Sequence, residues 1–298
     1  MAAPQNPARP SAALAALVRG ARTLVLTGAG LSTDSGIPDY RGPGSVPRNP
    51  MTYEQFVGDA GFRRHYWARN HVGWRHMAAT RPNDGHRAIT ALEAAGHVTG
   101  VVTQNVDTLH QRAGTRTVVD LHGSYDRVTC LGCGTLVTRE ALDARLTALN
   151  PGFRESHGPV DDIEIAPDAD AVIEATAGFV VAPCETCGGI LKPDIVYFGE
   201  QAPRERVERA FALVDDADVL LVAGSSLTVH SGLRFVRHAA RRGTPVAIVN
   251  RGATRGDDLA TLRLDAGTSE TLVGLLPHLL PVPVRPTPTL VGGGRITA

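Results

Sequence analysis

Lysine is almost absent from this sequence of 298 residues. The chain has 30 lysines and arginines together, and Lys192 is the only lysine among them. We interpret this preference for arginine as coding bias and not as function. The 30 basic residues are balanced by 30 acidic ones, so the chain carries no formal net charge. A balanced charge gives no indication of binding to nucleic acid or to an anionic membrane.

Long apolar runs are also lacking. No run approaches the roughly 18 apolar residues of a membrane-spanning helix. The first 22 residues contain arginine but no acidic residue, a composition similar to that of a transit peptide. However, residues 11–19 have the pattern of a short Ala/Leu helix that leads directly into a strand, and no secretory segment is visible. We therefore expect a cytoplasmic protein.

Cysteine is scarce, but its arrangement is informative. The four cysteines form two Cys-x-x-Cys pairs, Cys130 with Cys133 and Cys184 with Cys187, each followed by glycine. In a chain without an export signal, such pairs favour metal binding over disulfides. Two such turns can complete a closed, structural zinc site with Zn–S bonds of ~2.3 Å. The alternatives are redox dithiols or buried structural cysteines, and the 50 residues between the pairs exceed the usual spacing.

The rest of the composition is that of an ordinary globular protein, with 43% hydrophobic and 20% charged residues. Short apolar runs recur along the chain and are separated by helix-like stretches. They lie at residues 23–26, 98–103, 117–121, 195–198, 219–223 and 246–249. This alternation predicts an α/β fold with a Rossmann-like parallel sheet and helices on both faces.

The segments between these strands differ in character. Residues 53–95 have helical patterns, with Asp84 as the expected N-cap of the last helix. Residues 126–191 carry both cysteine pairs, and the composition of the Pro/Gly-rich tail is typical of disorder. We therefore expect a Rossmann-like domain, a helical insertion, a small zinc-binding domain and a disordered tail. Their expected bounds are 1–45, 80–125 and 192–280 for the first, then 46–79, 126–191 and 281–298.

The most specific stretch is GAGLSTDSGIPDYRG at residues 28–42, directly after the first predicted strand. Gly28 and Gly30 allow a sharp turn close to a ligand, and free N–H groups at a helix start suit a pyrophosphate. The usual dinucleotide fingerprint is not met, because Thr33 stands where a third glycine is needed. An acid, an aromatic ring and a guanidinium at residues 39–41 suggest chemistry on the dinucleotide itself.

Polar side chains follow the next two predicted strands. Asn105 and Asp107 come after the strand at 98–103, and His122 follows the strand at 117–121. Doubly wound sheets bind ligands at this edge, and an imidazole with a pKa near ~6.5 can accept a proton at neutral pH. His122 is therefore the candidate general base, although most of the 11 histidines are expected to be solvated or structural. Asn105 and Asp107 can bind an amide as a donor and acceptor pair, or they cap a helix.

These motifs, in this order, resemble those of the sirtuins, the NAD-dependent protein-lysine deacylases. The resemblance runs from about residue 11 to residue 280. It includes the stretch at 28–42, TQNVDTLH at 103–110, LHG at 121–123, both cysteine pairs, GSSL at 224–227 and VN at 249–250. The segments YWARN at 66–70 and GW at 73–74 are most similar to the class II branch.

The resemblance implies that the chain transfers an acyl group from a lysine of a protein substrate to ADP-ribose and releases nicotinamide. The acyl oxygen attacks the ribose of the co-substrate NAD, and a base then deprotonates a ribose hydroxyl that attacks the resulting imidate. His122 matches this base, and Asn105 and Asp107 match residues that line the nicotinamide pocket. The cysteines match ligands of one structural zinc ion. The implied NAD contacts are Gly28, Ala29, Gly30, Ser32, Asp34, Ile37, Pro38, Asp39, Tyr40, Arg41, Gln104, Asn105, Asp107, Gly224, Ser225, Ser226, Asn250, Arg251, Gly252 and Thr268.

Two further groups of residues concern the acylated substrate. Phe198, Gly199 and Glu200, with residues 227–229, resemble the two edges that clamp a substrate peptide as an added strand. Tyr66 and Arg69 lie three apart on a predicted helix and therefore share a face. They resemble a pair that meets the distal carboxylate of acidic acyl groups, for which Arg is well suited. The alternative is that Arg69 lies at the surface while Tyr66 packs.

Two other functions remain open from the sequence. The same pocket can support ADP-ribosyl transfer or NAD hydrolysis with a different acceptor. A catalytically silent NAD-binding module is a third possibility, although the complete set of Asn105, Asp107 and His122 argues against it. The sequence does not indicate the protein targets, the preferred acyl chain or the oligomeric state.

Overall fold

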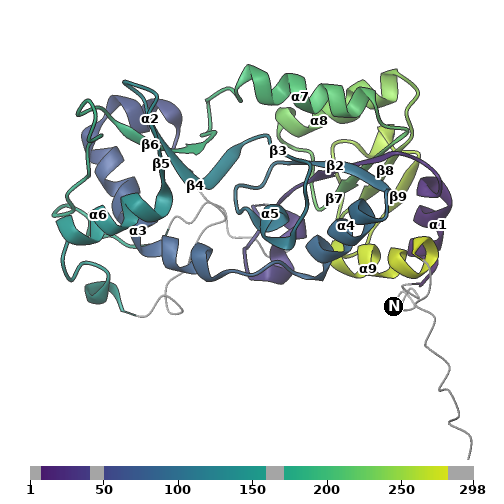
Figure 1. The fold of residues 1–298 in the computed structure, drawn as a ribbon, viewed down its shortest axis with the longest axis horizontal. Coiled ribbons are helices and arrows are strands. Elements are labelled where there is room, and N and C mark those ends of the chain that lie inside the picture. Colours follow the sequence, from purple (N-terminus) through teal and green to yellow (C-terminus); the bar gives the residue numbers. More distant parts are fainter. Residues whose placement is uncertain (1–7, 41–49, 159–170, 281–298) are drawn as a thin grey trace, which may run out of the picture.

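The computed structural model describes residues 8–40, 50–158 and 171–280, which form two modules lying side by side along the long axis of the molecule (Figure 1). The large module is built on a parallel six-stranded sheet of order β3-β2-β1-β7-β8-β9. Its strands are β1 (Thr23–Thr27), β2 (Val98–Thr103), β3 (Val118–Asp120), β7 (Val219–Ala223), β8 (Val246–Val249) and β9 (Leu262–Leu264). The predicted α/β fold with a Rossmann-like sheet is confirmed.

Helices cover both faces of this sheet because successive strand residues point to opposite sides. Val25 of β1 packs in a core with α1 (Ala8–Val18), α4 (Asp84–Ala94) and α9 (Thr268–Leu279). Leu24 and Leu26 pack in the opposite core with α7 (Arg204–Asp215) and α8 (His230–Arg241). Figure 1 shows α7 and α8 above the strands and α4 and α9 below them. The apolar strands are thus buried on both faces, as parallel sheets require.

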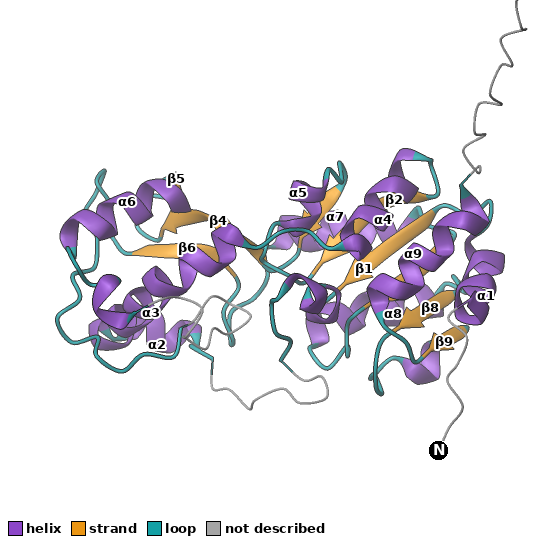
Figure 2. Cartoon of the chain, turned by 90° about the horizontal axis from the view of Figure 1, so that it is seen from below, coloured by secondary structure: helices purple, strands orange, loops and turns teal. Residues whose placement is uncertain are grey.

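The small module has a three-stranded antiparallel sheet of order β5-β4-β6. Its elements are β4 (Gly123–Cys130), β5 (Leu136–Thr138), β6 (Leu191–Ile195), α2 (Tyr53–Gly58), α3 (Ala60–Ala79) and α6 (Arg139–Leu149), seen together at the left of Figure 2. A separate core with Phe56, Trp67 and Tyr125 joins the helices to this sheet. The short helix α5 (Leu109–Ala113) follows β2 in the large module.

Two sequence predictions are wrong in detail. The strand predicted at 195–198 does not belong to the large sheet, because β6 ends at Ile195 and pairs with β4 of the small sheet. The chain therefore enters the small sheet at Gly123, directly after His122, and leaves it at Ile195. Asp84 does not cap α4, because the carboxamide of Asn83 accepts the hydrogen bond from the His86 N–H. The tail predicted to be disordered, 281–298, lies outside the described residues.

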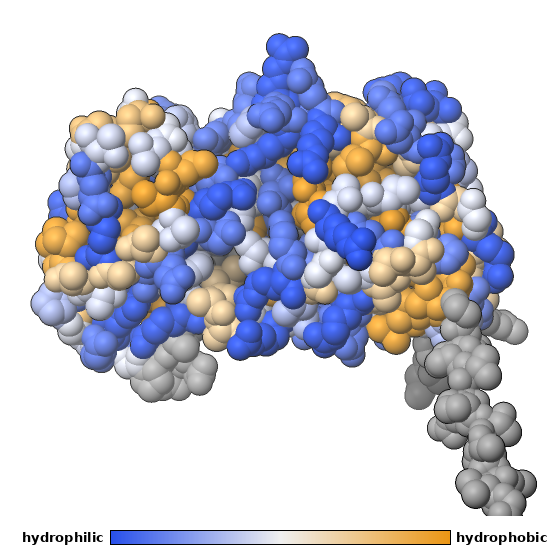
Figure 3. Space-filling model, viewed as in Figure 1, coloured by the Kyte–Doolittle hydropathy of each residue, from blue (hydrophilic) through white to orange (hydrophobic). Residues whose placement is uncertain are grey.

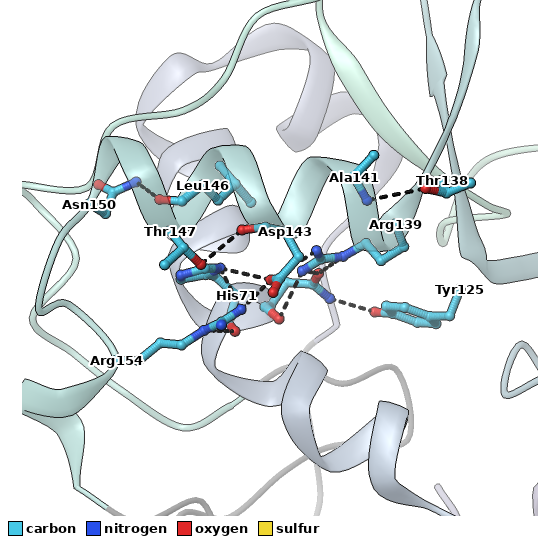
Figure 4. Close-up of polar contacts among 11 residues, drawn as sticks. His71, Tyr125, Thr138, Arg139, Ala141, Asp143, Leu146, Thr147, Asn150 and Arg154 are labelled. Carbon is cyan, nitrogen blue, oxygen red and sulfur yellow. Dashed lines mark hydrogen bonds and ion pairs between the residues drawn. The ribbon is translucent and has the colours of Figure 1, made fainter.

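A buried polar network joins α6 to α3 (Figure 4). The Arg139 guanidinium, fully buried, donates to Asn70 Oδ1 at 3.0 Å and to Asp143 Oδ1 at 3.2 Å. Asp143 also accepts hydrogen bonds from His71 and Arg154. Burial alone would raise the pKa of Asp143, but these bonds and the charge of Arg139 lower it to about 2. The buried cation is thus compensated, as a buried charge must be.

None of the helices within the described ranges combines the length and apolar character needed to cross a membrane. On the face drawn in Figure 3, apolar areas form separate patches between hydrophilic residues. Scattered apolar side chains of this kind are normal on a folded protein.

Candidate active site

The main cavity, of about 930 Å³, lies at the carboxyl ends of the central strands and against the small module. The sheet order changes direction between β1 and β7, because β2 and β3 follow on one side of β1 and β8 and β9 follow on the other. Doubly wound sheets bind ligands at this crossover. The cavity is lined by residues that follow β1, β2, β3, β6, β7 and β8. Segments far apart in the sequence thus meet at one site.

The glycines of the first loop are needed for close backbone contact between the segments after β1 and β7. Gly30 N–H donates to the Gly224 carbonyl at 2.8 Å. A Cβ on Gly28 would lie 2.8 Å from that same carbonyl oxygen. Gly224 has φ +68°, and a Cβ on it would lie 2.3 Å from the Leu31 nitrogen. The two turns therefore lock together only when glycine occupies these positions.

We expect Gly224→Ala to weaken NAD binding at least about tenfold, because the β1 loop must shift to make room for the new methyl group. Gly96→Ala is the matched control, since Gly96 also has positive φ (+82°) but a Cβ on it would meet no neighbouring atom within 4 Å. The control should lose only about 1 kcal/mol of stability from backbone strain. Calorimetric titration with NAD and thermal unfolding of both variants measure this. Equal effects of the two substitutions would contradict the close-contact role of Gly224.

Asn105, Asp107 and Ser32 form one hydrogen-bonded cluster at the cavity wall. Ser32 Oγ donates to Asp107 Oδ2 at 2.6 Å, and Asn105 Nδ2 donates to Ser32 Oγ and to the Gly28 carbonyl, both at 3.0 Å. Asp107 also accepts from the Leu109 N–H at 2.9 Å, at the start of α5. Burial raises the pKa of Asp107, and the bond from Ser32 opposes this. The N-cap position of α5 is Thr108, but Asp107 lines the cavity and bonds the first N–H of this helix, whereas the Asn105 side chain binds the first loop.

His122 is held as a neutral imidazole with a defined tautomer. Nδ1 lies 3.0 Å from the Gln104 carbonyl, which can only accept, so Nδ1 carries the hydrogen. Nε2 is then the basic nitrogen, and it accepts from Ser231 Oγ at 2.8 Å. Burial lowers the pKa of His122 to about 4, although the bond to Gln104 opposes this. The ring is thus unprotonated at pH 7 and lines the cavity, as a general base requires.

Ser231 is a site residue that the sequence analysis missed. It is the second residue of α8, four positions after the GSSL motif, and it lines the cavity. A polar residue soon after this motif was the available signal. Apolar residues that complete the cavity wall were missed too, including Met51, Val106 and Val196.

Most of the predicted NAD contacts come together in this cavity. The residues that line it are Gly28, Ala29, Gly30, Ser32, Asp34, Ile37, Asp39, Tyr40, Gln104, Asn105, Asp107, Gly224, Ser225, Ser226, Asn250, Arg251, Gly252 and Thr268. Ser225 Oγ donates to Gln104 Oε1 at 2.7 Å, and Thr268 Oγ1 donates to the Gly30 carbonyl at 3.0 Å. Pro38 is exposed and does not line the cavity. Arg41 lies outside the described residues.

The two predicted substrate-binding edges also line the cavity. One edge is formed by Phe198, Gly199 and Glu200, and the other by residues 227–229. The Phe198 carbonyl accepts a hydrogen bond from the Tyr53 N–H at 3.0 Å, which ties the first edge to α2. Phe198 is 41% exposed and meets the Tyr40 ring edge-on at 6.5 Å between ring centres. Both edges are therefore available at the cavity.

Tyr66 and Arg69 do not line the cavity. The Tyr66 ring is buried in an aromatic cluster, and its hydroxyl lies 3.2 Å from the hydroxyl of Tyr125. Arg69 Nε donates to the Ala171 carbonyl at 2.7 Å, and Nη1 lies 3.1 Å from His65 Nε2. In this structure both side chains bond to protein groups, and their contact with an acyl carboxylate stays a prediction.

The four cysteines of the small module come together in a cluster that can hold a metal ion. Their sulfur atoms all lie within 4.8 Å of one another, with Cys130 to Cys187 at 3.5 Å and Cys133 to Cys184 at 3.8 Å. Sulfurs at the corners of a zinc tetrahedron with ~2.3 Å bonds are about 3.8 Å apart. The Gly132 N–H points at Cys130 Sγ at 3.4 Å. The donor set and its spacing fit one structural zinc ion.

Comparisons with known proteins show which family this chain resembles. A model of the Sir2 family matches residues 28–231. An NAD-dependent protein deacetylase 1 of Mycobacterium avium is 63% identical over 272 residues, which cover 91% of this chain and 96% of the relative. A second protein of that name, from Streptomyces coelicolor, is 55% identical and covers 85% of this chain and 84% of its own length. A solved structure described as "Sir2-p53 peptide-NAD+" is 29% identical, with a TM-score of 0.70, over 89% of this chain and 96% of that one.

Proposed function

The chain belongs to the Sir2 family and is an NAD-dependent protein deacetylase with NAD as co-substrate and a structural zinc ion, and we propose that His122 is its general base. The observation that supports this role is the position of Nε2. It is the unprotonated nitrogen of a partly buried imidazole, and it faces the same cavity as the glycine loop. No other histidine in the described residues except His230 lines this cavity.

The proposed reaction divides the cavity between two substrates. The glycine loop and the segment after β7 hold the phosphates and ribose units of NAD, since their N–H groups and small side chains lie at the crossover of the sheet. We assign Asn105 and Asp107 to the wall of the nicotinamide pocket. Asn105 Nδ2 now donates to the Gly28 carbonyl and to Ser32 Oγ, so it must exchange one of these bonds to donate to the nicotinamide amide. The acyl oxygen of the lysine then attacks the ribose carbon as nicotinamide leaves.

His122 acts in the second half of the reaction. Nε2 accepts the proton of a ribose hydroxyl, and that hydroxyl oxygen attacks the imidate carbon as the C=N electron pair moves to nitrogen. Water then adds at this carbon and the lysine amine leaves, which yields deacetylated lysine and acetylated ADP-ribose. Ser231, which now donates to Nε2, must yield this position to the ribose hydroxyl. The Nδ1–H bond to the Gln104 carbonyl keeps the ring in place during the exchange and supports the imidazolium that forms.

The acylated peptide enters between the two edges. We propose that residues 198–200 and 227–229 add it as an extended strand, a mode in which backbone hydrogen bonds bind many sequences. The cavity location of both edges supports this role. The division into a Rossmann-like domain, a helical insertion and a zinc-binding domain is likewise proposed. Two sheets with separate cores support the first boundary, whereas the helical insertion and the zinc-binding segment share one core. We also propose a cytoplasmic location, because a reducing compartment keeps the four cysteine thiols free to bind a metal ion.

The competing activity is NAD hydrolysis or ADP-ribosyl transfer in the same cavity. The two reactions differ in their need for the acylated peptide. Nicotinamide release by the deacylase should depend on acetyl-lysine peptide and saturate with it, whereas hydrolysis needs no peptide. Measuring nicotinamide release with acetylated peptide, with unmodified peptide and with none separates the two. Equal rates in all three conditions would exclude the proposed reaction.

We expect Arg69→Met to leave the preference between acyl groups unchanged, because the guanidinium binds the Ala171 carbonyl and not the cavity. The test is kcat/KM for acetyl-lysine and glutaryl-lysine peptides in wild type and variant. A charge-assisted bond of about 1.5–3 kcal/mol to the acyl carboxylate, if present, would make the glutaryl substrate roughly ten- to hundredfold worse in the variant. Such a selective loss would restore the role predicted from the sequence.

A further inference from the structure

Lys192, the only lysine in the chain, is buried next to the substrate edge of the cavity. Its side chain is 4% exposed, and it belongs to β6, the strand that leads into residues 196–200. A lysine that is buried so completely needs partners for its charge. Because Lys192 is the only lysine and is buried, the described surface of this protein carries no lysine side chain.

Three oxygen atoms surround the Lys192 ammonium. Nζ donates to the Ile195 carbonyl at 2.5 Å, to the Pro193 carbonyl at 3.2 Å and to Glu200 Oε2 at 3.1 Å. An ammonium has three hydrogens, so this geometry uses all of them. The ammonium also lies 4.9 Å from the centre of the Tyr197 ring. Every partner belongs to residues 193–200, which are the end of β6 and the cavity edge that follows it.

The Glu200 carboxylate, which pairs with the Lys192 ammonium, also bonds the backbone of the cavity edge. Glu200 Oε2 accepts the Tyr197 N–H at 2.9 Å, and the Glu200 N–H donates to the Tyr197 carbonyl at 3.0 Å. Residues 197–200 are thus closed into a turn, with Gly199 at the left-handed φ of +82°. The Lys192 ammonium fixes the carboxylate that closes this turn.

The same segment is joined to the catalytic base. The Val196 N–H donates to the His122 carbonyl at 2.8 Å. Next to His122, a Cβ on Gly123 would lie 1.8 Å from the Asp194 carbonyl, so the two backbones are in direct contact. A displacement of residues 196–200 would therefore alter the peptide edge and its distance from His122 together.

We propose that Lys192 is a positioning residue, which holds the edge at residues 198–200 in the shape that accepts the acylated peptide. The inference rests on the proposed peptide-binding role of this edge. The Lys192–Glu200 pair acts on peptide binding and not on NAD, whose predicted contacts lie after β1, β2, β7, β8 and β9 and include no residue of 192–200. An ordinary buried ion pair would affect only stability. The distinction is therefore between a selective change in peptide affinity and a general loss of folded protein.

The test is a double-mutant cycle with Glu200→Gln and Lys192→Met, read as the Kd of a fluorescent acetyl-lysine peptide by anisotropy and the Kd of NAD by calorimetry. Glu200→Gln keeps an acceptor for the Tyr197 N–H but removes the charge. We expect each single variant to weaken peptide binding at least about tenfold, the double variant to be no worse than either, and NAD affinity to change less than about twofold. Lys192→Arg should restore most of the peptide affinity. Asp218→Asn, which breaks an exposed ion pair with Arg22, is the control and should change neither.

Several outcomes would overturn the proposal. Unchanged peptide affinity in Lys192→Met would show that Glu200 binds the peptide without Lys192. The same conclusion would follow if the free-energy losses of the two single variants add up in the double variant. Equal losses of peptide and NAD affinity would indicate general damage. If Lys192→Met does not fold, a second experiment tests the proposal. The rate at which acetic anhydride acetylates Lys192 is compared between the wild type and Glu200→Gln. Mass spectrometry should then show faster labelling in the variant, and slower labelling in wild type with bound peptide. Equal labelling rates would contradict the role of Lys192 in holding the edge.

Because these readouts are affinities, they do not depend on turnover. A failure of the proposed catalytic role of His122 would leave the peptide Kd values of these variants unaffected. A failure of the Lys192 proposal would leave deacetylation by the wild type intact. The two results are therefore distinguishable.

Discussion

His122→Ala is expected to slow deacetylation by about 10²–10⁴-fold while NAD affinity changes little, because the ring acts only after nicotinamide has left. The variant should still exchange labelled nicotinamide into NAD in the presence of acetylated peptide, since that exchange needs only the first half of the reaction. His157→Ala is the control, because His157 bonds within its own segment of the small module, to Ser156 and Phe153. Deacetylation at the wild-type rate by His122→Ala would refute the assignment.

The same assignment predicts the acid limb of the pH profile. A histidine whose pKa is lowered by burial to about 4 is neutral down to lower pH than one in water. In the free enzyme, kcat/KM should therefore decrease only when the pH drops below about 4–5, rather than near the ordinary histidine value of ~6.5.

The stability of the fold should also decrease at low pH, because burial lowers the pKa of His86 to about 4 as well. Between the unfolded value of ~6.5 and 4, the unfolded chain binds more protons, so the free energy of unfolding falls as the pH is lowered.

Removal of zinc is expected to unfold the small module and abolish activity. Structural zinc contributes about 10–16 kcal/mol of apparent binding energy in zinc-finger peptides, and whole domains are stable by only about 5–15 kcal/mol. The cysteine pairs end β4 and precede β6, so loss of the metal releases the strands that carry the Val196 and His122 contact. Chelator treatment and Cys130→Ala should both lower the melting temperature and the circular dichroism signal.

The zinc experiment needs a count of metal per chain. Elemental analysis should find one zinc ion in the purified wild type, and added zinc should restore activity after mild chelation but not in Cys130→Ala. A control substitution at exposed Leu136 of the small module should leave the zinc content unchanged. A purified protein that is active and contains no zinc would contradict a structural role for the metal.

The parts of the fold that the sequence predicted best are those specified locally. The strand at Val98–Thr103 was predicted with its observed bounds, because an apolar, β-branched run between a helix and a polar motif has few alternatives. The glycine loop, His122 and the cysteine pairs follow from local spacing in the same way. Of these features, the glycine loop and His122 line the cavity.

Other features depend on tertiary contacts and could not be read from the chain. Residues 195–198 look like a buried strand, but pairing of Ile195 with Gly123 places β6 in the other sheet. Tyr66 and Arg69 share a helix face, yet their spacing cannot tell whether that face meets the cavity or Ala171. Ser231 bonds His122 only because the fold brings the start of α8 next to the segment that follows β3. The charge of Lys192 is likewise explained only by the three oxygens that the fold assembles around it.

The central claim is that this cavity transfers an acyl group from lysine to the ADP-ribose of NAD, with His122 as base. The most direct measurement is a product balance by mass spectrometry after incubation with NAD and an acetyl-lysine peptide. The wild type should form equal amounts of deacetylated peptide, nicotinamide and acetylated ADP-ribose, and His122→Ala should form none of the first or third within the same time. Nicotinamide released together with free ADP-ribose and intact acetylated peptide would contradict the claim.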